Sequence, residues 1–195
     1  MGAHHWGGSD RADVEGFRAL AAGADAAVLL RAQGAVTMDG LATAKALAAE
    51  LETRGEQLVL FGVKAGDDDQ QQVGPMVATL LGRPCASNAT SFEVGEGVLR
   101  CHRDVEGGTE VVELDLPAVV TLTKGAFELR FASLKGIMAA KRKPLDVKDV
   151  DLPESRLSVE RLDYPPERAE GWILGEGADA VPELVQFLRD EANVL

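Results

Sequence analysis

The chain has 195 residues, 46% of them hydrophobic and 27% charged, an ordinary composition for one globular domain with an appendage. Its 20 basic and 32 acidic residues give a formal net charge of −12, which argues against nucleic acid or an anionic membrane as the main partner. No apolar run approaches the roughly 18 residues that span a bilayer, so no membrane insertion is expected. The start of the sequence shows no secretory signal. The two cysteines, Cys85 and Cys101, fit no disulfide framework or zinc spacing, and we interpret them as buried thiols.

The first half of the sequence alternates between helical and strand patterns. Apolar spacing predicts helices at residues 11–22, from 37 or 39 to 53, and at 73–81. Strands are predicted at residues 26–30 and 57–61, and the second is continuously apolar, as is typical of strands covered on both faces. This order favours an α/β fold with a parallel sheet flanked by helices.

The second half begins with a different pattern. Glycine-rich turns separate predicted strands at residues 91–94, 98–103 and 110–116, which indicates a small antiparallel excursion. A buried strand at 118–122 and a helix at 134–143 follow. Residues 146–177 are charged and rich in turn residues, so we predict an extended C-terminal arm, ending in a helix at 180–192 that needs a surface to dock on. The predicted boundary divides a domain at 1–145 from an arm and helix at 146–195.

The loop after the strand at 57–61 is the sharpest candidate for a binding site. Ligands of open α/β sheets bind where the strands end, and the free N–H groups of a helix start can hold a phosphate. We therefore predict that this loop binds a nucleotide. The alternative is that its aspartates only cap the following helix and remain solvated. The candidate residues are Gly62, Ala65, Asp67, Asp68, Asp69, Gln70, Gln71, Gln72, Val73 and Gly74.

No reaction centre accompanies this loop. It lacks the Gly-Lys-Ser/Thr of a P-loop and the GxGxxG of a dinucleotide fold, and no GxSxG nucleophile elbow occurs in the sequence. His4, His5 and His102 are scattered, and no pair of carboxylates stands out as an acid and a base. We therefore expect no catalytic residue and no metal site.

A second feature lies at residues 130–144. Leu134, Ile137 and Met138 form an apolar helical face beside the basic residues 141–143, which is unusual in so acidic a protein. One interpretation is a core helix with a solvated basic end. The other is a docking surface in which an apolar anchor is rimmed by charge.

Together these segments resemble the small (beta) subunit of electron-transfer flavoprotein. The family's Ala-x-Asp-Asp-Asp loop and following Gln-x-Gly-x-Met match residues 65–76, and its Leu-Pro-Ala-Val-Val-Thr matches 116–121. Its Arg-Tyr-Ala-Ser/Thr-Leu-x-x-Ile-Met segment matches 130–138, with Phe131 for tyrosine. Matches around Pro165, Pro166 and the closing Leu-Arg-Asp-Glu-Ala extend the resemblance over nearly the whole chain.

The resemblance implies a Rossmann-like fold of the adenine-nucleotide alpha-hydrolase type and a heterodimer with an alpha subunit. FAD would be shared with that subunit, AMP or a second FAD would occupy the loop at 62–74, and the redox chemistry would belong to the flavin. Leu134 falls on the family's anchor leucine, which docks onto acyl-CoA dehydrogenases and related flavoenzymes in fatty acid oxidation. Residues 146–195 would dock on the alpha subunit. The family implies a cytoplasmic protein in bacteria, or one of the mitochondrial matrix in eukaryotes.

The sequence also departs from the family pattern. The family's further N-terminal portion, with a first strand and an Asn-Pro-Phe/Tyr-Asp segment, has no counterpart here, so the domain is expected to be N-terminally shortened. Lys64 and Gly66 replace the usual loop residues, and Lys135-Gly136 replaces Pro-Asn after the anchor. The sequence leaves two alternatives open: a stand-alone nucleotide-binding enzyme or stress-type domain, and a truncated family member that binds nucleotide or acts as a scaffold without electron transfer.

Overall fold

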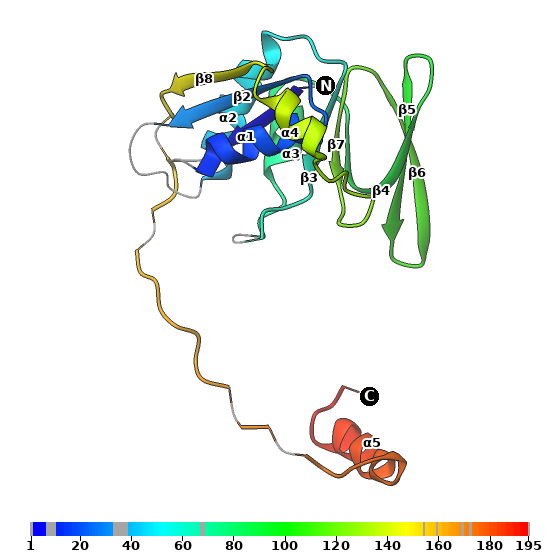
Figure 1. The fold of residues 1–195 in the computed structure, drawn as a ribbon. Coiled ribbons are helices and arrows are strands. Elements are labelled where there is room, and N and C mark those ends of the chain that lie inside the picture. Colours follow the sequence, from blue (N-terminus) through cyan, green and yellow to red (C-terminus); the bar gives the residue numbers. More distant parts are fainter. Residues whose placement is uncertain are drawn as a thin grey trace. The chain divides into compact units, whose positions relative to one another are not determined.

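The computed structural model describes residues 2–6, 11–32, 39–66, 69–153, 155–158, 160–168, 170–171 and 173–194 (Figure 1). The chain divides into two compact units, Met1–Val159 and Glu160–Leu195. The predicted helix start at Thr37 lies outside the described residues, as do Asp67 and Asp68 of the candidate loop. Each unit is taken by itself below.

The first sheet of the larger unit is parallel and has the order β1-β2-β8. It consists of β1 (Gly2–Trp6), β2 (Ala26–Ala32) and β8 (Leu145–Val150). Residues 146–150 therefore lie in a sheet rather than in the extended arm that the sequence predicts. The charged residues Asp146, Lys148 and Asp149 led to the prediction of an arm here, and one of them, Lys148, pairs with the buried carboxylate of Glu50 at 2.8 Å.

The second sheet has the order β3-β7-β4-β5-β6. The strands β3 (Leu58–Gly62), β7 (Ala118–Leu122) and β4 (Cys85–Val94) are parallel, whereas β5 (Val98–Val105) and β6 (Gly108–Asp115) continue the sheet in antiparallel fashion. The predicted antiparallel excursion is thus the outer part of a mixed sheet.

Helices cover the strands from two directions, as Figure 1 shows. Helices α2 (Gly40–Glu52) and α3 (Val73–Leu80) share one core with Val28 of β2, Val59 of β3 and Val119 of β7. Helices α1 (Arg11–Ala22) and α4 (Leu134–Ala140) share another core, in which Leu20 and Ala140 pack with Ala27 of β2. Because β2 contributes alternate residues to both cores, its apolar run is continuous. The cover on both faces that the sequence predicts for residues 57–61 is wrong for β3, an edge strand in which Val59 is buried but Leu60 is 41% exposed.

Strand β7 is buried on both faces for a different reason. Val119 faces the core beneath α2 and α3, whereas Ala118 and Val120 pack with Leu99 and Cys101 from the antiparallel part of the same sheet. Cys101 is buried, as interpreted from the sequence, whereas Cys85 is only partly buried, and burial raises the pKa of both thiols.

The smaller unit contains the short 3-10 helix η1 (Ala178–Ala180) and helix α5 (Val181–Asp190), close to the predicted bounds. Its apolar side chains are poorly covered within the unit: Leu162 and Tyr164 are almost fully exposed, and Val181 and Leu184 of α5 are exposed as well. Within the described ranges, no helix combines the length and apolar character needed to cross a bilayer.

Candidate functional site

Both candidate segments leave the same edge of the second sheet. Strands β3 and β7 are parallel neighbours, with Phe61 opposite Thr121 and Gly62 opposite Leu122. The loop at 63–72 follows β3 and the segment at 123–133 follows β7. The sheet therefore brings together, at the carboxyl ends of two strands, the two regions that the sequence singles out.

The loop after β3 leads to the start of α3, where the N-cap side chain makes no hydrogen bond to the first N–H groups of the helix. Gln72 is the N-cap of α3, but its side chain makes no capping hydrogen bond to the helix. Its amide instead donates a hydrogen bond to Gln70. The N–H groups of Val73 and Gly74 therefore receive no bond from Gln72, and the helix dipole favours an anion there.

Helix α2 starts beside α3 but is closed. The Asp39 carboxylate accepts hydrogen bonds from the N–H of Leu41 at 2.9 Å and of Ala42 at 3.2 Å, as a capping residue does. Gln72 packs against the first residue of this helix, because a Cβ added to Gly40 would lie 3.0 Å from the Gln72 Nε2 atom. Of two adjacent helix starts, only that of α2 has a carboxylate cap among the described residues.

Asp39 also holds the beginning of the C-terminal segment. Its second carboxylate oxygen accepts hydrogen bonds from the Ser155 hydroxyl at 3.0 Å and the Arg156 N–H at 3.1 Å. Burial alone would raise the pKa of Asp39, but these hydrogen bonds and those of the cap outweigh it, and the pKa lies below its ordinary value. Asp39 thus fixes residues 155–156 to the start of α2.

The loop itself is mostly exposed, and its described aspartate is already paired. Lys64 forms an ion pair with Asp69, and the Asp69 N–H donates to the Ala65 carbonyl at 3.2 Å. Asp69 and Gln71 both adopt left-handed backbone conformations, with φ values of 56°. Asp69 therefore does not cap α3, and its pairing with Lys64 reduces the repulsion that it would exert on a phosphate.

The glycines of this region have different roles. A Cβ added to Gly66 would meet nothing within 4 Å, and one added to Gly62 would meet only a carbonyl at 3.9 Å. A Cβ added to Gly74 would lie 2.5 Å from the Thr121 Cγ2 atom and 3.4 Å from Phe61. Gly74 is therefore required for packing α3 on β7, a role that the sequence does not indicate.

The segment after β7 exposes large apolar side chains. Leu134 is 78% exposed, Phe131 is 92% exposed and Leu129 is 85% exposed, while Met138 is about half exposed and Ile137 lies at the margin of exposure. Leu134 is thus not a core residue, which argues against the interpretation of this helix as a core helix. The ring of Phe127 meets that of Phe92 on β4 edge to face, at 5.1 Å between centroids.

The basic residues beside this segment divide into two groups. Lys141 and Arg142 are exposed, as the sequence predicts. Lys143 turns back onto α1 instead, where its Nζ donates to the Leu20 carbonyl at 3.1 Å and the Ala24 carbonyl at 2.6 Å. It therefore belongs to the fold rather than to a solvated basic cluster.

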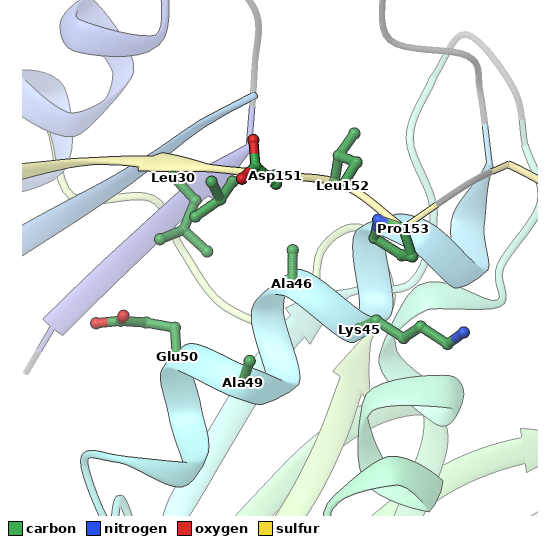
Figure 2. Close-up of a pocket in the computed structure, with 9 residues that line it drawn as sticks. Leu30, Lys45, Ala46, Ala49, Glu50, Asp151, Leu152 and Pro153 are labelled. Atoms are coloured by element: carbon green, nitrogen blue, oxygen red, sulfur yellow. The ribbon is translucent and has the colours of Figure 1, made fainter. Parts of the chain in front are cut away.

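A pocket of about 600 Å³ lies away from both segments, between α2 and the end of β8 (Figure 2). Its walls include Ala46 and Ala49 of α2 and Leu152 after β8, and it contains none of the predicted site residues. Glu50 at its side is already paired with Arg54 at 2.6 Å as well as with Lys148.

Across the described part of the chain, no group of three or more His, Cys, Asp or Glu residues could hold a metal ion.

Several residues of these sites were not found from the sequence. Asp39 was a possible helix start, but nothing local indicates its bonds to residues 155–156 more than a hundred positions away. The contact between Gly74 and Thr121 is also long-range. Phe131 had only its apolar character and its place beside Leu134 as a signal.

Comparisons with known proteins agree with this arrangement. The model of the "Electron transfer flavoprotein domain" family matches residues 6–153. The "Electron transfer flavoprotein subunit beta" of Syntrophomonas wolfei is 37% identical over 96% of this chain and 74% of its own length. The protein of the same description from Bacillus subtilis is 36% identical over 96% of this chain and 77% of its own length. The human protein of this description is 36% identical over 88% of this chain and 69% of its own length. On this evidence the chain belongs to the electron transfer flavoprotein family and is one of its beta subunits.

Proposed function

We propose that this chain works with an alpha subunit as an electron carrier and accepts electrons from acyl-CoA dehydrogenase-type flavoenzymes for a downstream acceptor. The observation that carries the proposal is the exposed apolar segment after β7, which lies beside Lys141 and Arg142 in a member of this family. Flavin, when bound, supplies the redox chemistry. The residues of this chain then bind, orient and dock, and none of them makes or breaks a substrate bond.

The loop at 62–74 is proposed to hold the phosphate of AMP, or of a second FAD. Three observations support the fit: the open start of α3, the free space at Gly62 and Gly66, and the pairing of Asp69 with Lys64. The N–H groups of Val73 and Gly74 would donate to phosphate oxygens. Asp67 and Asp68 remain candidates through the resemblance alone, as do Ala65, Gln70 and Gln71.

Release of the bound nucleotide tests this site. The complex with the alpha subunit is denatured, and the supernatant is analysed by chromatography for AMP and FAD. We expect an adenine nucleotide in addition to the shared FAD, and a Gly66→Val variant should retain less of it because its side chain occupies the approach. Gly108→Val is the matched control, because Gly108 also has open space around it but lies on β6. Folded complex without any second nucleotide would contradict the site.

The docking role is tested at Leu134. Because this side chain is 78% exposed, Leu134→Ala should change the free energy of unfolding by less than about 0.5 kcal/mol. It should weaken docking to the dehydrogenase by about 2 kcal/mol, as an interface anchor does. Leu99→Ala, at a fully buried leucine, should instead cost about 2–5 kcal/mol of stability. Unimpaired electron transfer by Leu134→Ala at limiting dehydrogenase would refute the docking role.

The division of the flavin between two subunits is tested by co-expression. The chain purified alone should retain no stoichiometric FAD, whereas the complex with an alpha subunit should be yellow. The poorly covered apolar residues of the arm and α5 support docking of the smaller unit, residues 160–195, on that subunit. Removing residues 160–195 should therefore reduce the yield of complex, and stoichiometric FAD on the isolated chain would contradict the proposal.

A further inference from the structure

We propose that the end of α1 and the two residues after it, residues 20–24, are the platform that positions the exposed docking segment, with Lys143 and Gly136 as its positioning residues. The inference rests on the proposed docking function and assigns residues outside the anchor to it. Three contacts join the segment at 130–143 to this platform, and each is made by a different part of the segment.

The first contact is made by Lys143. The last carbonyls of a helix have no partner within the helix, and a cation near them is favoured by the helix dipole. The Lys143 ammonium is such a cation, and it donates to the carbonyls of Leu20 in the last turn at 3.1 Å and of Ala24 just after the helix at 2.6 Å. Lys143 thus ties the end of α1 to the chain directly after α4.

The second contact is made by Gly136, in the first turn of α4. A Cβ at this position would collide with the Ala21 carbonyl oxygen. The Gly136 N–H donates to the Ser133 hydroxyl at 3.0 Å as part of the helix cap, so the backbone of Gly136 is also fixed within α4. Only glycine lets this turn of α4 lie so close to the Ala21 carbonyl at the end of α1.

The third contact is made by Arg130, which precedes the anchor. Its guanidinium lies over Gly23, since a Cβ added there would be 3.5 Å from the Arg130 Nη1 atom. Beneath these contacts Ala140 is buried against Leu20, Ala21 and Ala24. The segment is therefore held along its length by one helical turn, while Phe131, Leu134 and Met138 remain exposed between the held points.

Holding an exposed apolar loop in this way has a consequence for docking. A seven-residue helix is not stable by itself in water, so α4 depends on its packing against α1. Without the platform, the segment would have to be ordered again each time a dehydrogenase binds, and that cost would weaken binding. The rate of electron transfer within the formed complex would not change.

The test uses Lys143→Met in the full chain, purified with its alpha subunit. Loss of hydrogen bonds to a charged donor changes a local equilibrium by roughly tenfold or more, so amide hydrogen exchange over residues 134–140 should accelerate by about that factor. The dehydrogenase concentration for half-maximal electron transfer should rise by a similar factor, at an unchanged maximal rate. Gly136→Ala should do the same, although alanine favours helix. Lys45→Met, at an exposed lysine of α2, is the control for charge and should change neither measurement.

The outcomes separate this proposal from the docking function itself. Unchanged hydrogen exchange in Lys143→Met would overturn the platform, and so would faster exchange with unchanged half-saturation. A lower maximal rate at the same half-saturation would also overturn it, because that result indicates loss of folded protein. Leu134→Ala is measured in parallel: if it too leaves half-saturation unchanged, the docking function fails, whatever the hydrogen exchange shows.

Discussion

The loop after β3 and the segment after β7 start side by side at one sheet edge, yet they are built in opposite ways. The first leads directly into α3, which packs so closely on the sheet that a Cβ added to Gly74 would lie 2.5 Å from the Thr121 Cγ2 atom. The second crosses to α1 and displays Phe131 and Leu134 to solvent. A site that offers backbone N–H groups to a small ligand needs a fixed helix, whereas a site that offers side chains to a protein needs exposed ones.

The strongest test of this contrast is Gly74→Val. Its side chain would collide with Thr121 and Phe61, and such overpacking typically costs about 1–3 kcal/mol of unfolding free energy. Gly66→Val, in the open part of the same loop, should cost less than about 0.5 kcal/mol. Urea unfolding of both variants provides the measurement. Equal stabilities would mean that α3 is free to shift and that the two regions are not built differently.

A second experiment identifies the colliding atom. Gly74→Ala places its Cβ near the Thr121 Cγ2 atom, and Thr121→Ser removes that methyl group but keeps the hydroxyl, which accepts a hydrogen bond from the Asn88 N–H at 3.0 Å. The double variant should therefore recover at least about 0.5 kcal/mol relative to the sum of the single variants. Strict additivity in the double-mutant cycle would place the strain elsewhere.

The next effect is a pH dependence of stability that comes from Asp39, the carboxylate cap of α2. The neighbouring helix α3 has no side-chain cap from its own N-cap residue. The folded-state pKa of Asp39 lies below its ordinary value, so its contribution to stability is present above about pH 4 and is lost as the pH falls through the folded pKa. Asparagine can cap the helix without titrating. The stability advantage of the wild type over Asp39→Asn should therefore shrink between pH 7 and pH 3 in urea unfolding. An advantage that grows on acidification would reverse the assigned sign.

The smallest effect is expected from the exposed cations beside the docking segment. Replacing Lys141 and Arg142 with alanine should change the unfolding free energy by no more than about 0.5 kcal/mol. It should slow association with the dehydrogenase and weaken the dependence of that rate on salt, because exposed charges mainly steer the encounter. Stopped-flow measurements at several salt concentrations check this. An association rate independent of both residues would limit the docking surface to its apolar part.

The sequence predicted what local patterns determine. The helix at 11–22 matches α1, the antiparallel strands occur, and the family follows from motifs at 65–76 and 130–138. The strand β8 was predicted as part of the arm because residues 146–177 are charged and rich in turn residues, but its charges are compensated by distant groups such as Glu50. The boundary after residue 145 consequently falls within this strand, whereas the contacts divide the chain after Val159. Docking of residues 146–195 on another subunit stays a prediction.

The same distinction applies to the candidate sites. The spacing of Leu134, Ile137 and Met138 shows a helical face, but spacing alone does not tell whether that face is covered. Lys143 reads as part of a basic run with Lys141 and Arg142, yet it turns to α1, more than a hundred residues earlier in the sequence. The role of Gly74 depends on Thr121, and no pattern within the loop reports that neighbour.

The attachment of Ser155 and Arg156 to Asp39 gives the C-terminal helix a defined tether. The 24 residues at 157–180 can span at most about 80 Å when fully extended, so α5 stays within that radius of the start of α2. Once either unit is bound to another subunit, the other searches only this small volume, and its binding becomes an intramolecular event at high effective concentration. A weak contact of the larger unit with that subunit could then open and close repeatedly without loss of the assembly.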